Sequence, residues 1–168
     1  HQILARPRSM LEFPDGDGEE AVILAKTAAR EMKKDSGPRV AVFDVEGFDT
    51  HAAQGGNDGE HGEKLGNADE LLRVLRDEMG DKFDDTLVLT LTEFGRTLHQ
   101  NGGYGTEHGY GTAILMAGGL LRKAQIHTDW PGLMTKGLFE GRDLNATIDA
   151  RAVYCSAMAA CFDVDFGY

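Results

Sequence analysis

The sequence predicts an α/β fold, in which helices cover both faces of a β-sheet. Helical and strand-like segments follow one another in the order helix, strand, helix, strand, strand, helix. The strand-like segments are continuous apolar runs rather than alternations of apolar and polar residues, which is typical of strands buried on both faces. In such folds ligands bind beyond the carboxyl ends of the strands, so we expect the site in the loops that follow them.

Three segments carry apolar residues at helical spacing. They predict helices over residues 19–35, 63–80 and 149–161. Glycine and proline end the first of these helices, and a glycine ends the second. Cys155 and Cys161 lie six residues apart in the third helix. We expect them to point in different directions, to form no disulfide and to serve as small core residues.

The strand predictions depend on short runs of β-branched and aliphatic residues. Residues 39–45 and 86–92 are the two main strands, and the second is the clearer because it reads Thr-Leu-Val-Leu-Thr-Leu-Thr. A further apolar strand is expected over residues 112–116, and a short one near Ile126.

Polar, glycine-rich segments fill the spaces between these elements. Residues 46–62 and 99–111 are predicted to be loops, and residues 1–18, with two prolines and an Asp-Gly-Asp-Gly run, a loop or lead-in. With 168 residues, the chain is long enough for one α/β domain spanning residues 1–168. Because the chain opens with His1 rather than Met, we expect a processed product or part of a longer protein.

The composition argues against two classes of partner. The chain has 28 acidic and 17 basic side chains, a formal charge of −11, whereas binding to nucleic acid requires a basic surface. The apolar runs fall short of the ~20 residues that span a bilayer, and no signal peptide is visible. We therefore expect neither a nucleic-acid partner nor a membrane span.

The first loop contains a possible pair of metal ligands. In the segment Gly-Phe-Asp-Thr-His that follows the strand at 39–45, Asp49 and His51 stand two residues apart. Alternate side chains of an extended chain project to the same side, so the carboxylate and the imidazole can reach one ion. Both are ordinary ligands of zinc. The alternative is a pair of surface residues.

A second segment, Thr-Glu-Phe-Gly-Arg-Thr, follows the clearest strand. Glu93 stands at the strand end, where a carboxylate is either functional or a cap for the turn that follows. The Arg96 guanidinium is suited to a phosphate or sulfate oxygen, although an ion pair with Glu93 is an equal alternative.

The third segment, Gly-Thr-Glu-His-Gly, places His108 among glycines. Small neighbours let the backbone approach a bound group closely, although His108 could also be an ordinary loop histidine. Glu107 is adjacent, and in an extended chain its side chain should point away from that of His108.

Together these three motifs resemble the bacterial DUF1501 family, of the alkaline phosphatase and sulfatase-like superfamily, from about residue 39 to the end of the chain. The resemblance implies a three-layer sandwich around a mostly parallel sheet, of which this chain is the C-terminal part. It also implies hydrolysis of small-molecule phosphate or sulfate esters with divalent metal ions, zinc being favoured, and a periplasmic or extracellular location.

By this resemblance the metal ligands are Asp49, His51, Glu93 and His108. In such a reaction we expect Arg96 to neutralise a nonbridging oxygen of the substrate. The sequence departs from the superfamily pattern at Phe94, where a histidine is common, and at Glu107, where the family more often has Asp. The nucleophile of the superfamily lies in an N-terminal part with no counterpart here. The alternatives are a non-catalytic binding or structural module with the same fold and, less favoured, a phosphomutase-like transferase.

Overall fold

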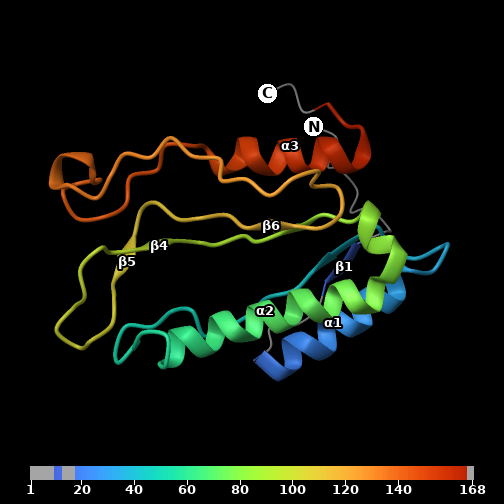
Figure 1. Ribbon diagram of the computed structural model, residues 1–168, viewed down its shortest axis with the longest axis horizontal. Helices are drawn as coiled ribbons and strands as arrows, with labels where there is room; N and C mark the ends of the chain where they lie inside the picture. Colours follow the sequence, from blue (N-terminus) through green and yellow to red (C-terminus); the bar gives the residue numbers. More distant parts are fainter. Residues whose placement is uncertain (1–9, 13–17, 166–168) are drawn as a thin grey trace, which may run out of the picture. The chain divides into compact units, whose positions relative to one another are not determined.

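The structure, a computed structural model, describes residues 10–12 and 18–165. Within these residues the chain forms three α-helices, two 3₁₀-helices and six short strands (Figure 1). The chain divides into two compact units, one of His1–Thr50 with Gly55–Phe83 and the other of His51–Gln54 with Asp84–Tyr168. None of the helices described here is long and apolar enough to cross a membrane.

The first unit is a helix pair accompanied by a two-stranded sheet. Its strands β1 (Met10–Glu12) and β2 (Val40–Val42) are parallel, with Met10 opposite Val40. Its helices α1 (Gly18–Met32) and α2 (Glu60–Met79) lie side by side (Figure 1). Both helices confirm the sequence predictions to within three residues at each end. The strand β1 lies in the segment predicted to be a loop or lead-in, the rest of which falls largely outside the described residues.

Alanines on α1 meet larger aliphatic side chains on α2. The buried residues recur at helical spacing on each helix, as expected for two facing apolar stripes. They are Ala21, Ala25, Ala28, Ala29, Leu71, Val74, Leu75 and Met79. At the edge of this core, Arg30 donates to both carboxylate oxygens of Glu78, at 3.3 and 3.2 Å. The small α1 stripe lets the two helix backbones approach closely.

This close packing predicts that a larger side chain at Ala28 will destabilise the first unit. Ala28 has no exposed surface, so Ala28→Leu should lower the free energy of unfolding by about 1–3 kcal/mol through overpacking. Ala160→Leu, the same substitution at an exposed position in a helix, is the matched control and should change it by less than ~0.5 kcal/mol. Urea denaturation followed by circular dichroism measures the stability of both variants. Equal midpoints for Ala28→Leu and Ala160→Leu would contradict the close packing of α1 against α2.

The second unit contains two small antiparallel sheets and one helix. Strand β3 (Val88–Leu89) pairs with β6 (Met116–Ala117), and β4 (Gly95–Arg96) pairs with β5 (His108–Gly109). The 3₁₀-helix η1 (Gly80–Asp85) follows α2, and its residues up to Phe83 belong to the first unit. The 3₁₀-helix η2 (Thr135–Gly137) lies in the second unit and precedes the last helix. That helix, α3 (Ala150–Phe162), was predicted from its apolar spacing. Asp149 caps it by accepting the Arg151 amide at 2.9 Å.

The prediction of a three-layer sandwich around a mostly parallel sheet is wrong. Each described sheet has two strands, and only the β1–β2 pair is parallel. The run at 86–92 forms a ladder at Val88 and Leu89 only. At Thr90 one main-chain bond remains, from the Thr90 amide to the Leu115 carbonyl at 3.0 Å, whereas the Leu115 amide donates to the Thr90 hydroxyl at 2.9 Å. An apolar run indicates burial but fixes neither the direction nor the length of pairing.

Smaller predictions also differ from the structure. The segment near Ile126 forms no strand, and Ile126 is 92% exposed. The loop predicted over 99–111 contains β5. Cys155 and Cys161 form no disulfide, as predicted, but both are half-buried rather than core residues. Partial burial raises the pKa of the Cys161 thiol.

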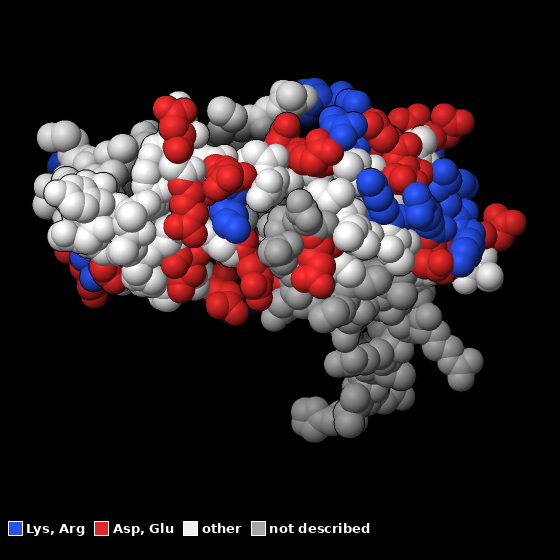
Figure 2. All heavy atoms as spheres, turned by 90° about the horizontal axis from the view of Figure 1, so that it is seen from below, with Lys and Arg blue, Asp and Glu red and all other residues white. Residues whose placement is uncertain are grey.

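On the face shown in Figure 2, acidic side chains are spread among uncharged residues. This distribution agrees with the excess of acidic residues in the composition.

Candidate metal centre

Glycines allow the β4–β5 hairpin to form. Arg96 stands opposite His108 in the antiparallel register, and Gly95 opposite Gly109. A Cβ atom on Gly95 would lie 1.9 Å from the Gly111 carbonyl oxygen, and one on Gly109 would lie 2.5 Å from the Arg96 carbonyl carbon. Since real Cβ atoms do not come so close to backbone atoms, both positions require glycine. The hairpin thereby fixes the backbone that carries His108.

The loop at the end of this hairpin is held against residues 51–54. The Ala53 amide donates to the Gly103 carbonyl at 2.8 Å, and the Gln54 amide donates to the Tyr104 carbonyl at 2.9 Å. Gly105 is so close that a Cβ atom there would lie 2.2 Å from the His51 carbonyl carbon. These backbone contacts bring His51 to the hairpin.

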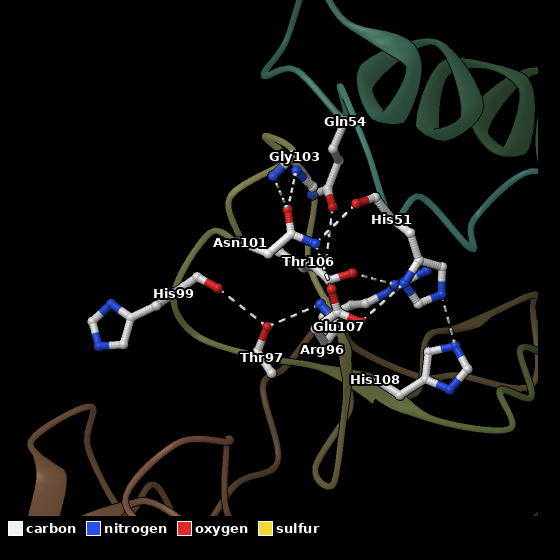
Figure 3. A network of polar contacts seen from close by, with 11 residues as sticks. His51, Gln54, Arg96, Thr97, His99, Asn101, Gly103, Thr106, Glu107 and His108 are labelled. Atoms are coloured by element: carbon white, nitrogen blue, oxygen red, sulfur yellow. Dashed lines mark hydrogen bonds and ion pairs between the residues drawn. The ribbon is translucent and has the colours of Figure 1, made fainter.

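The two histidines face each other at this contact. His51 Nε2 lies 3.2 Å from His108 Nε2, with the ring planes tilted by 43° (Figure 3). Asp49, His51 and His108 can each offer one ligand atom, and these atoms all lie within 4.8 Å of one another. Asp49 and His51 are separated along the chain by Thr50. Asp49, His51 and His108 are all exposed residues.

The Glu107 carboxylate contacts His51 at Nδ1, the ring nitrogen that does not face His108. Glu107 Oε2 is 3.2 Å from His51 Nδ1, and Glu107 Oε1 accepts a hydrogen bond of 2.5 Å from Asn101 Nδ2 (Figure 3). The Asn101 amide, and to a lesser extent the two histidines, hold the pKa of Glu107 below its usual value. An ionised carboxylate only accepts hydrogen bonds, so this contact favours the His51 tautomer that carries its proton on Nδ1 and turns the Nε2 lone pair toward His108.

The prediction that the Glu107 side chain points away from that of His108 missed this arrangement. The two neighbours do project differently, but an imidazole carries nitrogens on two edges. Glu107 meets one edge of the His51 ring and His108 meets the other. Adjacent residues therefore serve the same imidazole from different sides.

Phe94 and Arg96 lie next to the second histidine. The Phe94 ring stacks on the His108 ring, with centroids 3.7 Å apart and planes 11° from parallel. The Arg96 guanidinium carbon lies 5.2 Å from the Phe94 ring centroid, and Arg96 Nη1 donates to the Thr106 carbonyl at 3.0 Å. The stack limits rotation of the His108 ring.

A model of the family described as "Protein of unknown function (DUF1501)" matches residues 10–157. The chain belongs to this family. The predicted resemblance to DUF1501 is thus confirmed, whereas the wider alkaline phosphatase and sulfatase-like superfamily stays a prediction. Searches of curated proteins and of solved structures gave no match.

In this DUF1501 chain the structure brings together three of the four predicted ligands. Asp49, His51 and His108 form the candidate group, and Glu93, which is exposed, is not part of it. The separation of the two Nε2 atoms suits a metal. At zinc–nitrogen bonds of 2.0–2.1 Å, two ligands of a tetrahedral ion lie about 3.3 Å apart, close to the 3.2 Å observed.

Sequence reasoning missed two residues of this DUF1501 site. Glu107 was considered only for its direction along the chain, and Asn101 was not considered. The available signal for Asn101 was its place before Gly102 and Gly103, because asparagine side chains often accept hydrogen bonds from the backbone of such turns. Nothing local indicates that the same side chain reaches His51.

Proposed function

We propose that this chain supplies a divalent-metal centre, with zinc as the favoured ion, to a hydrolase of phosphate or sulfate esters. The observation that carries the proposal is the opposed pair of Nε2 atoms, 3.2 Å apart, with a carboxylate on the far edge of the His51 ring. Histidines that bind metals commonly donate their other N–H to a carboxylate, which fixes the tautomer and the ring orientation.

Each residue has a distinct role in this proposal. His51 and His108 would bind the ion through Nε2, and Asp49 through a carboxylate oxygen. Glu107 would orient His51 and keep its proton on Nδ1. Three protein ligands leave a position open, which is typical of catalytic rather than structural zinc. A bound ion would act as a Lewis acid toward an ester oxygen, and Arg96 stays the residue proposed to neutralise another oxygen.

A non-catalytic binding or structural module is the second candidate. The observation in its favour is Phe94, whose ring occupies the space beside His108 at 3.7 Å. The superfamily often has a histidine at this point of the motif, so the site would hold one ion at most through the residues described above.

Zinc binding and ester hydrolysis test the two candidates. The metal-free chain is titrated with zinc in competition with a chromophoric chelator, and the loaded chain is assayed with an aryl phosphate and an aryl sulfate. One zinc per chain together with zinc-dependent hydrolysis of either ester supports the hydrolase. One zinc without hydrolysis favours the module, and no stoichiometric zinc overturns the metal centre.

A further inference from the structure

We infer that Asn101 is a positioning residue that selects the tautomer of His51 through Glu107. Its link to metal binding rests on the proposed function, but the tautomer itself is a property of the metal-free chain. The Asn101 side chain makes four hydrogen bonds (Figure 3).

The Asn101 amide uses its full hydrogen-bonding capacity. Nδ2 donates to the His51 carbonyl at 2.9 Å and to Glu107 Oε1 at 2.5 Å. Oδ1 accepts from the amides of Gly103 and Gly105 at 2.9 and 3.0 Å. A primary amide has two N–H donors and two acceptor lone pairs, so these four bonds leave none unused.

This set of partners fixes the orientation of the amide. Rotating the Asn101 amide by 180° would place its oxygen against two acceptors, the His51 carbonyl and the Glu107 carboxylate. It would also place its nitrogen against the two glycine N–H donors. All four contacts would become repulsive, so the partners determine which atom faces Glu107. Asn101 therefore always presents a donor to residue 107.

A fixed donor determines what Glu107 presents to His51. One carboxylate oxygen accepts from Asn101 and the other lies 3.2 Å from His51 Nδ1. The same asparagine holds the His51 main chain through the carbonyl. Asn101 thus holds the His51 backbone directly and the His51 ring through the Glu107 carboxylate. The result is a proton on Nδ1 and a lone pair on Nε2, the atom that faces His108.

Reversing the polarity of this relay provides the sharpest test. In Glu107→Gln, Asn101 should still donate, so the new amide oxygen must face Asn101 and the new amide nitrogen must face His51 Nδ1. His51 Nδ1 would then have to accept a hydrogen bond from this amide nitrogen, so the His51 proton should move to Nε2. In the double variant Asn101→Asp/Glu107→Gln, the new carboxylate at 101 loses the hydrogen bond to the His51 carbonyl but accepts from the amide at 107, whose oxygen turns to His51. The proton should return to Nδ1.

The ¹⁵N chemical shifts of the His51 ring in the metal-free chain distinguish the two tautomers. We expect Nδ1–H in the wild type, Nε2–H in Glu107→Gln and Nδ1–H again in the double variant. The same tautomer in all three proteins, each with a native-like amide spectrum, would overturn the role of Asn101. An asparagine that only stabilised the fold would not make the His51 tautomer alternate among the three proteins. The tautomer pattern therefore separates positioning of His51 from an effect on folding stability.

Zinc affinity connects this result to the proposed function. The dissociation constant should rise about 10–100-fold in Glu107→Gln, the usual effect of losing a partner of a metal-bound histidine, and should recover in part in the double variant. Asn57→Asp/Glu107→Gln restores the negative charge at an exposed asparagine instead, and its affinity should stay within about threefold of that of Glu107→Gln. If the tautomers alternate but the wild type binds no zinc, the proposed function fails while the role of Asn101 stands. Affinity equal to wild type in Glu107→Gln would overturn the link between them.

Discussion

Replacing His108 by alanine should raise the zinc dissociation constant of this chain more than 100-fold. His108 contributes one of only three ligand atoms in the candidate group, and its Nε2 is 3.2 Å from that of His51. Losing a residue that merely orients a ligand typically costs 10–100-fold in affinity, so losing the ligand itself should cost more. The removal of one imidazole should also abolish any zinc-dependent ester hydrolysis.

The measurement is a zinc titration in competition with a chelator, with cobalt as a spectroscopic substitute that reports the number of nitrogen ligands. His127→Ala removes an exposed imidazole elsewhere in the chain and is the matched control. Its affinity should stay within about threefold of the wild type. If His108→Ala and His127→Ala bind zinc equally well, the ion is held by other groups and the proposed centre is wrong.

Replacing Gly105 by alanine should damage both stability and metal binding. A Cβ atom at this position would lie 2.2 Å from the His51 carbonyl carbon, 2.3 Å from its oxygen and 2.5 Å from the Ala52 nitrogen. These are backbone atoms, which cannot move aside as the end of a flexible side chain can. Relief requires the loop to separate from His51, at a cost of at least ~1–3 kcal/mol in the free energy of unfolding.

Gly102→Ala provides the control within the same loop. A Cβ atom on Gly102 meets nothing within 4 Å, so this substitution should change stability by less than ~0.5 kcal/mol and leave zinc affinity unchanged. Urea denaturation of the metal-free proteins measures stability without any contribution from zinc. Indistinguishable midpoints for the two alanine variants would show that the close approach of Gly105 to His51 is not present in solution.

The helices could be predicted from the sequence because their signal is local. The apolar residues of α1, α2 and α3 recur within a few positions of one another, and each helix was placed to within a few residues. Strand pairing could not be predicted in the same way, since direction and length depend on partners far along the chain. At Thr90 a hydroxyl takes the place of one main-chain acceptor, while the Thr90 amide still donates to the Leu115 carbonyl. No apolar pattern indicates such an exchange.

The candidate site shows the same division between local and distant signals. Asp49 and His51 were recognisable because two residues of extended chain place both side chains on one side. His108 was recognisable by its glycine neighbours. Glu107 and Asn101 were missed because their importance comes from contacts with His51, more than 40 positions away. Their chemistry became visible only when the loop and the histidine were seen together.

The separation of the two histidines along the chain has a consequence for folding. His51 and His108 are 57 positions apart, so a denatured chain that held one ion through both would first have to close a loop of that length. The entropic cost of such closure is roughly 3–4 kcal/mol beyond a constant term. An ion at this centre would therefore bind the native state in strong preference to the denatured ensemble, and metal supply in the cell would set how much of the protein stays folded.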